Sequence, residues 1–239
     1  MKIENFIVTG CSFTSGVFKC NTNLQSAQTY WEQNSYAWPH FAFADLGVYK
    51  KNFFNFALPG GGNIAAMTNL VLFLEKNPHI NHTNTLIGIN ITELSRIDYI
   101  TDKNDPQANR DAANKHIIDH LNIGWITGQI QNYKLNLEYQ TAAFIIQTLT
   151  YLESKNIQYF FMLMTDSIYN TSPEFFQNFL HLRRKKWITF DSYKGMENFV
   201  IDKKTIVSNN DTHPNKEGHK IIAAYVTKHL RNPNYEYQL

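Results

Sequence analysis

The stretch IENFIVTGCSFTSG, residues 3–16, contains the pattern that decides the fold. Its first half, Ile3 to Thr9, is mostly apolar and ends at Gly10, which predicts a short buried strand. Its second half is a turn of small residues that carries Ser12. A serine delivered by a strand into such a turn is exposed, and the backbone N–H groups that follow it can face a developing oxyanion. A plain turn, or a helix N-cap at the serine, is the simpler explanation of the same residues.

Strands and helices alternate along the rest of the chain. Apolar runs bounded by turn residues predict strands, and apolar residues at helical spacing predict helices. We expect further strands at 52–57, 85–91 and 158–164, a fifth at 188–190 or 205–207, and helices at 36–46, 63–76, 136–155, 173–183 and 215–231. This order indicates βαβ units, and therefore a flavodoxin-like three-layer α/β/α sandwich with a central parallel sheet. Active sites in such sheets lie beyond the carboxyl ends of the strands.

We expect one domain over 1–239, with an insertion at 96–135. The insertion is polar and lacks a sustained period, although a short helix is expected near 112–121. There His116 and His120 have the spacing of metal ligands one helical turn apart. No third ligand is evident, so two surface histidines are the expected case, and no metal or organic cofactor is predicted.

Composition argues against several classes of protein. Hydrophobic residues make up 43% and charged residues 18% of the chain, which is typical of a globular protein. The net charge of +2 gives no reason to expect nucleic acid or an anionic membrane as partner. Cys11 and Cys20 are too few for a disulfide framework, so we expect free thiols in a reducing compartment. No run approaches the ~20 apolar residues of a membrane span, and no signal peptide is visible, so we expect a cytoplasmic or virion-associated protein.

A second polar cluster lies near the C-terminus, where residues 209–215 read NNDTHPN. This segment places a carboxylate close to His213 just before a helix. A serine nucleophile needs an imidazole base, and a carboxylate commonly orients that imidazole. The simpler alternative is that Asn215 caps the helix and His213 is a surface residue.

Four short blocks, taken in order, resemble the SGNH (GDSL-like) hydrolase family. They are GCSFT at 10–14, NFALPG at 55–60, GIN at 88–90 and DTHPN at 211–215. The first resembles phage or bacterial relatives of that family. The resemblance implies that Ser12 attacks a carbonyl and His213 takes its proton. It also implies that the Ser12 N–H, the Gly60 N–H and the Asn90 amide hold the oxyanion. The expected substrate is a small ester or an acylated glycan; the sequence sets no oligomeric state.

Three positions depart from the family pattern. Cys11 precedes the serine where the best-known members have Asp, and it is a rival nucleophile. The usual acid position, three residues before the histidine, holds Asn210, so we predict that Asp211 orients His213. Ile91 follows Asn90 in place of the frequent Asp, and Asn63 is a second amide that could reach the site.

Two other functions compete with ester hydrolysis. Residues 60–65 match Gly-x-Gly-x-x-Ala after a strand, the dinucleotide-binding fingerprint, but the strand at 85–91 ends without the carboxylate that fingerprint requires. A Rossmann-type nucleotide-binding module is therefore the weaker interpretation. The altered acid spacing favours instead an SGNH-like module that binds carbohydrate or serves a structural role without catalysis.

Overall fold

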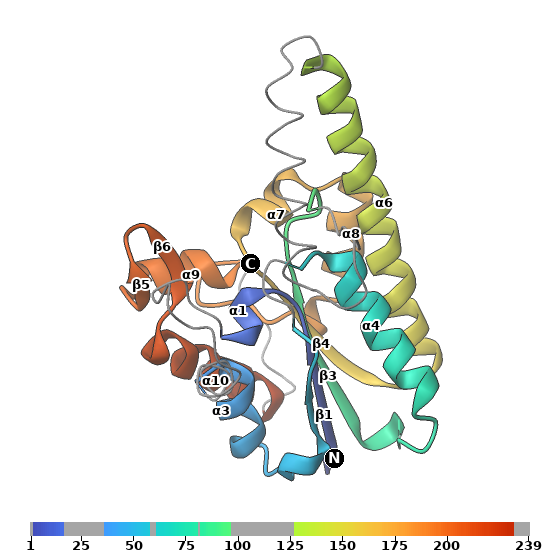
Figure 1. The fold of residues 1–239 in the computed structure, drawn as a ribbon, viewed down its shortest axis with the longest axis vertical. Helices are drawn as coiled ribbons and strands as arrows, with labels where there is room; N and C mark the ends of the chain where they lie inside the picture. The colour runs from blue at the N-terminus through green and yellow to red at the C-terminus, as the bar shows by residue number, and fades with distance from the viewer. Residues whose placement is uncertain (1, 17–35, 58–60, 81, 97–126, 232–239) are drawn as a thin grey trace, which may run out of the picture.

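The computed structural model describes residues 2–16, 36–57, 61–80, 82–96 and 127–231. Its centre is a parallel sheet in the order β2-β1-β3-β4 (Figure 1). The strands are β1 (Asn5–Thr9), β2 (Phe53–Asn55), β3 (Thr85–Ile91) and β4 (Gln158–Leu163). In the register, Ile7 pairs with Phe54 on one side and Ile87 on the other, and Ile87 pairs with Tyr159.

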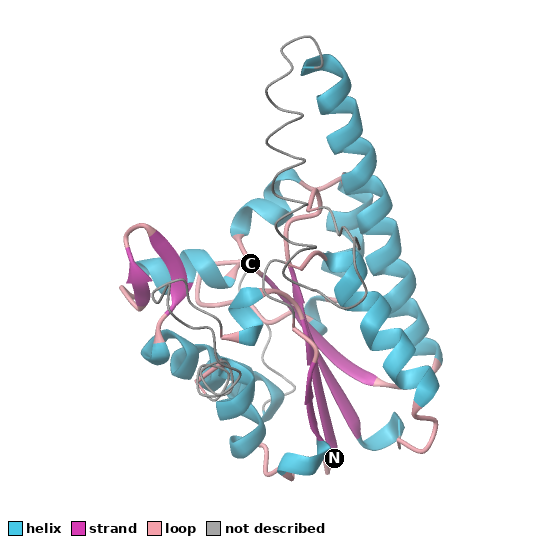
Figure 2. Cartoon of the chain, in the orientation of Figure 1, coloured by secondary structure: helices cyan, strands magenta, loops and turns pink. Residues whose placement is uncertain are grey.

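Helices cover both faces of this sheet, which confirms the predicted three-layer sandwich (Figures 1 and 2). One face carries α4 (Asn63–Lys76) and α6 (Thr127–Ser154), which pack together, and the other carries α3 (Trp38–Asp45) against α10 (Lys216–Arg231). The remaining described helices are α1 (Ser12–Ser15), α7 (Asp166–Thr171), α8 (Glu174–Leu182), α9 (Met196–Asp202) and the 3-10 turns Lys50–Asn52, His82–Asn84 and Arg184–Lys186. Within the described parts of the chain, no helix has both the length and the apolar character needed to cross a membrane.

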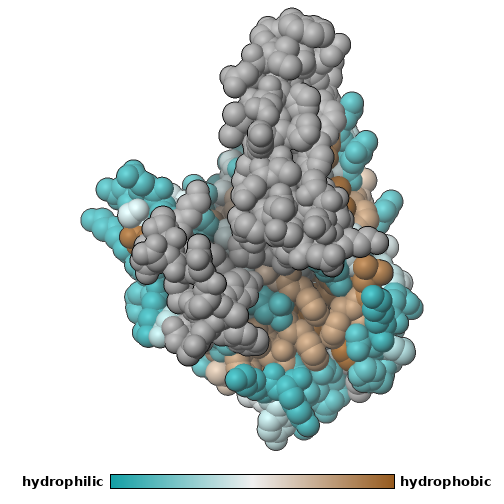
Figure 3. Space-filling model, in the orientation of Figure 1, coloured by the Kyte–Doolittle hydropathy of each residue, from teal (hydrophilic) through white to brown (hydrophobic). Residues whose placement is uncertain are grey.

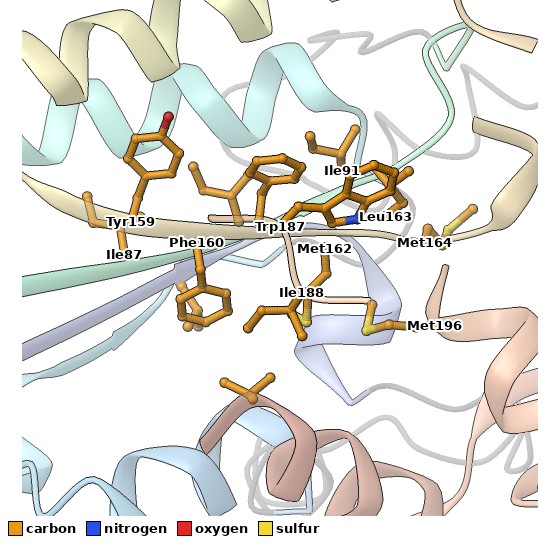
Figure 4. Packing of buried hydrophobic residues seen from close by; sticks show 14 of the residues in the cluster. Ile87, Ile91, Tyr159, Phe160, Met162, Leu163, Met164, Trp187, Ile188 and Met196 are labelled. Carbon is orange, nitrogen blue, oxygen red and sulfur yellow. The ribbon is translucent and has the colours of Figure 1, made fainter. Parts of the chain in front are cut away.

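The middle strands are buried from both sides, as parallel strands between helix layers must be. All seven residues of β3 are buried. Figure 4 shows side chains of β4 alternating, with Tyr159 toward one helix layer and Phe160 toward the other. A Cβ at Gly88 would lie 2.6 Å from the Phe160 ring, so the glycine makes the space that this ring fills.

The edge strand β2 is less covered. Its phenylalanines are only partly buried and stack with rings from neighbouring helices, as in the pair Phe43–Phe53 at 4.6 Å between centroids. Figure 3 shows apolar residues gathered in the lower middle of the view, in the region where Figure 1 draws the strands of the sheet.

The expected fifth strand of the central sheet is wrong. Trp187 forms only an isolated parallel bridge to Phe161. A tight turn follows, in which the backbones of Phe190 and Tyr193 are hydrogen-bonded to each other, and the chain does not continue along β4. The alternative, 205–207, falls largely in β5 (Ile206–Ser208). This strand pairs antiparallel with β6 (Asp211–Pro214) in a separate two-stranded sheet.

Helix α6 begins at Thr127, inside the segment expected to be an insertion. Its buried apolar stripe runs from Ala142 to Leu152, so periodicity predicted the helix only from 136 onward. The described first half extends past the sheet (Figure 1) and is polar, with Lys134 and Glu138 paired one turn apart. The expected short helix at 112–121 lies outside the described residues.

Candidate active site

Ser12 stands where the first strand meets the first helical turn. β1 ends at Thr9, Gly10 has φ +149, and α1 starts at Ser12 itself. A Cβ on Gly10 would lie 2.7 Å from the Cβ of Asn90. Only glycine therefore lets the end of β1 approach β3 this closely, and the approach places the serine turn beside Asn90.

His213 reaches Ser12 from 201 residues further along the chain. The Ser12 Oγ lies 2.7 Å from His213 Nε2, and His213 Nδ1 lies 2.6 Å from Asp211 Oδ1. When Nδ1 carries the proton and donates it to the carboxylate, Nε2 is left with a lone pair that can accept from the serine hydroxyl. The three side chains thus form a connected Ser–His–Asp chain, the arrangement that a serine nucleophile, its base and an orienting acid require.

The hairpin that carries His213 is fixed by a few polar contacts. Asp211 and His213 share one face of β6, and the intervening Thr212 donates its hydroxyl to the carboxylate of Glu197 on α9. Asn215 caps α10 by accepting from the N–H groups of Glu217 and Gly218, both at 3.0 Å. The same Asn215 donates to the carbonyl of Ile206 across the hairpin. The Phe13 ring, 4.9 Å from the imidazole between centroids, packs against the base from the serine turn.

Asn90, the expected oxyanion donor, is buried beside the serine turn. It is 1% exposed at the end of β3, and its Oδ1 accepts a hydrogen bond from the Cys11 thiol at 3.3 Å. Its Nδ2 is buried and has no hydrogen-bond partner among the described residues. A buried NH2 group without a partner is uncommon, because no hydrogen bond offsets the hydration that it loses. A transient oxyanion would accept such a hydrogen bond. Gly60, the other expected donor, lies outside the described residues.

Cys11 is poorly suited to act as the nucleophile. The thiol is fully buried, and this burial raises its pKa, which keeps it protonated. Its sulfur lies 3.6 Å from the Met164 sulfur as well as against Asn90. Cys11 therefore orients the Asn90 amide as a neutral donor.

The other two candidate amides do not take the roles considered for them. Asn63 donates to the carbonyls of Thr92 and Glu93 and accepts from the Thr92 N–H at 2.9 Å. These bonds engage both ends of its amide in holding the loop after β3. Asn210 is exposed at the hairpin turn, while the carboxylate on His213 Nδ1 comes from Asp211.

Some residues of the site have no motif in the sequence. The Glu197–Thr212 contact was not predicted; the position of Thr212 between Asp211 and His213 on a strand is the one signal that could have indicated it. His116 and His120 lie outside the described residues. The described residues contain no group of three or more His, Cys, Asp or Glu side chains that could hold a metal ion.

The fold is similar to that of solved SGNH hydrolases. A member of the lipolytic G-D-S-L family from Veillonella parvula matches with TM-score 0.52 and 14% identity, over 94% of this chain and 97% of that one. TesA matches with TM-score 0.51 and 11% identity, over 96% and 99%. The chain therefore has the α/β/α fold of the SGNH hydrolases.

A carbohydrate esterase also matches, with TM-score 0.45 and 14% identity over 96% of this chain. This chain spans 65% of the length of that esterase. No protein-family model and no curated protein sequence matches the chain.

Proposed function

We propose that the protein is a serine esterase that hydrolyses a small acyl ester, such as an O-acetyl group on a carbohydrate. The observation that carries this proposal is the chain of contacts from Ser12 through His213 to Asp211, at 2.7 and 2.6 Å. The buried Asn90 NH2 group on the neighbouring strand end supports it, because ester hydrolysis generates the negative oxygen that such a donor would bind.

In the first half of the reaction, Ser12 Oγ attacks the ester carbonyl while His213 Nε2 takes its proton. The C–O double bond becomes a single bond, and Asn90 Nδ2 donates to the oxygen that now bears the charge. Asp211 stabilises the imidazolium. His213 then gives the proton to the departing alcohol oxygen, and the acyl group remains on Ser12.

In the second half, His213 takes a proton from water, whose oxygen attacks the acyl-serine. The tetrahedral intermediate again places its charge at Asn90, and collapse returns the proton to Ser12 and releases the acid. The Ser12 and Gly60 N–H groups would complete the oxyanion hole, as the family resemblance implies. Each donor of this kind contributes roughly 3 to 4 kcal/mol of transition-state stabilisation where it has been measured.

The test is intact-mass analysis after treatment with a fluorophosphonate, followed by assays of acetylated sugars and nitrophenyl esters. We expect one adduct on the wild-type protein and none on Ser12→Ala or His213→Ala. Ser154→Ala is the matched control, because this exposed serine lies on α6. Well-folded wild-type protein that forms no adduct and cleaves no ester would contradict the proposal and favour a module that binds glycans without catalysis.

A further inference from the structure

Arg96 is a cation beside the candidate site with no carboxylate partner among the described residues. It lies six residues after Asn90, on the loop that leaves β3, and is partly buried. Its Nη1 donates to the carbonyl of Gly61 at 3.4 Å, a long bond to a neutral acceptor. A guanidinium has five N–H donors in a planar fork, and among the described residues the carbonyl of Gly61 is the one hydrogen-bond acceptor that the Arg96 side chain meets.

Three observations link this guanidinium to the candidate site: a hydrogen bond of its own, the bonds that hold its loop, and its electrostatic effect on Cys11. Gly61 immediately precedes Gly62, the N-cap of α4, so Arg96 lies at the positive end of a 14-residue helix. Asn63, the first residue of α4, bonds to the loop between Asn90 and Arg96. The charge of Arg96 also acts on the Cys11 thiol, where it lowers a pKa that burial raises. Cys11 in turn precedes Ser12 and bonds to Asn90.

We propose that Arg96 binds a carboxylate carried by the ester substrate, and so makes the site selective for anionic esters. This proposal rests on the proposed function, and it names the substrate class of the same site. Among the described residues the partly buried Arg96 has no anionic partner, and its guanidinium fork matches a carboxylate in a bidentate manner. The N-terminal end of α4, beside Arg96, adds a positive electrostatic potential that also favours an anion. The carboxylate belongs either to the acyl chain or to the sugar, as in an O-acetylated uronic acid.

Two matched pairs of esters separate these sources. On the acyl side, the 4-nitrophenyl ester of succinic acid is compared with its methyl ester, which lacks the charge. On the alcohol side, O-acetylated methyl glucuronide is compared with O-acetylated methyl glucoside. Each is assayed with wild-type protein, Arg96→Gln and Arg96→Lys. Lys76→Gln is the matched control, because it removes one exposed positive charge at the C-terminal end of α4, away from Arg96.

We expect wild-type kcat/KM to favour the anionic member of one pair by roughly 10- to 100-fold, the range of a charge-assisted hydrogen bond. Arg96→Gln should abolish that preference while changing hydrolysis of the neutral member little. Arg96→Lys should keep part of it, since the charge remains and the fork is lost. Lys76→Gln should behave as wild type. Equal rates within both pairs, or a preference that survives Arg96→Gln, would overturn the proposal and leave the esterase intact.

Calorimetry with the two acetylated sugars distinguishes failure of the function from failure of the anion site. Arg96-dependent binding of the glucuronide without hydrolysis or labelling would support the anion site and contradict the esterase. Binding that does not depend on Arg96, in protein that cleaves nothing, would overturn both. An Arg96→Gln variant that loses thermal stability and slows both members of each pair alike would show a structural role and overturn the anion site.

Discussion

The proposed nucleophile and the proposed base are held by two differently built parts of the molecule. Ser12 follows a strand at the centre of a buried parallel sheet, where Gly10, Cys11 and Asn90 pack without space for one more carbon. His213 belongs to a two-stranded hairpin outside that sheet, partly exposed and tied down by a few hydrogen bonds. Steric contact therefore fixes one half of the site and polar contact the other. Substitutions should accordingly fail by overpacking on the serine side and by loss of orientation on the histidine side.

The largest effect is expected at the acid. Asp211→Ala removes the carboxylate on His213 Nδ1, which leaves the imidazole free to adopt the wrong tautomer or orientation. We expect kcat to fall by roughly 10⁴-fold, as for the acid of well-studied triads, while the unfolding temperature changes little.

Asn210→Ala is the matched control for this prediction, because Asn210 precedes Asp211 and is exposed. Steady-state kinetics on the preferred ester decides between the two residues. Full activity in Asp211→Ala together with loss in Asn210→Ala would transfer the orienting role to Asn210.

The steric side is tested by Gly10→Ala. The added Cβ would meet Asn90 Cβ at 2.7 Å and Thr14 Oγ1 at 2.9 Å, at a φ of +149 that side chains rarely adopt. Strain and overpacking together should lower the free energy of unfolding by about 2 to 5 kcal/mol and displace the Asn90 amide. Chemical denaturation measures the first effect, and fluorophosphonate labelling the second.

Gly47→Ala separates the two contributions, because Gly47 also has positive φ, at +70, but nothing lies within 4 Å of its added Cβ. It should cost only about 1 kcal/mol. Equal losses in the two variants would show that close packing against Asn90 contributes nothing.

Many elements of the fold and several residues of the candidate site could be predicted from the sequence, for reasons that differ from one element to the next. The helix at 63–76 and the strand at 85–91 were predicted to the residue, because each has a sustained apolar pattern. The hairpin strand 211–214 was read as a loop, because Asp-Thr-His-Pro has no apolar alternation and pairs with only three residues. Ser12, His213 and Asp211 could be selected from ordered motifs. The bonds that engage Asn63 could not, because they depend on which backbone groups the fold brings to its amide.

Acid should lower the stability of the protein through the helix that follows the His213 hairpin. His219, in the first turns of α10, is fully buried and accepts a hydrogen bond from the Trp38 N–H at 3.2 Å, which joins α10 to α3. Burial, with a smaller contribution from nearby His213, lowers the pKa of His219 to about 3. The unfolded chain has a histidine pKa of about 6.5. The stability that buried, neutral His219 gives to the folded state is therefore fully present above about pH 6.5. It is lost as pH falls toward 3, at up to about 1.4 kcal/mol per pH unit.

Urea unfolding at pH 8, 6.5, 5.5 and 4.5 measures this slope. His219→Gln should be less stable than wild type at pH 8 yet lose less stability on acidification. Burial also lowers the pKa values of His40 and His229, which would account for part of the slope that remains. His181→Gln, which replaces an exposed histidine on α8, is the matched control variant. An unchanged slope in His219→Gln would show that this histidine does not link the hairpin side to pH.

The smallest expected effect tests whether the hairpin needs its outer anchor. Thr212→Val keeps the shape of the side chain but removes the hydroxyl that donates to Glu197. A hydrogen bond to a charged group contributes about 1.5 to 3 kcal/mol, and the exposed hairpin should recover part of this by hydration. We expect kcat to fall by roughly 3- to 30-fold with KM nearly constant, since loosening the hairpin misaligns the base more than it alters substrate binding.

Thr212→Ser restores the hydroxyl and should recover most of the lost kcat, a rescue that a purely steric role for Thr212 would not predict. Glu197→Gln keeps an acceptor without the charge and should fall between the two. If Thr212→Val retains full kcat, the pairing of β5 with β6 and the Asn215 cap are sufficient to hold His213 against Ser12. The polar half of the site would then be as firmly fixed as the steric half.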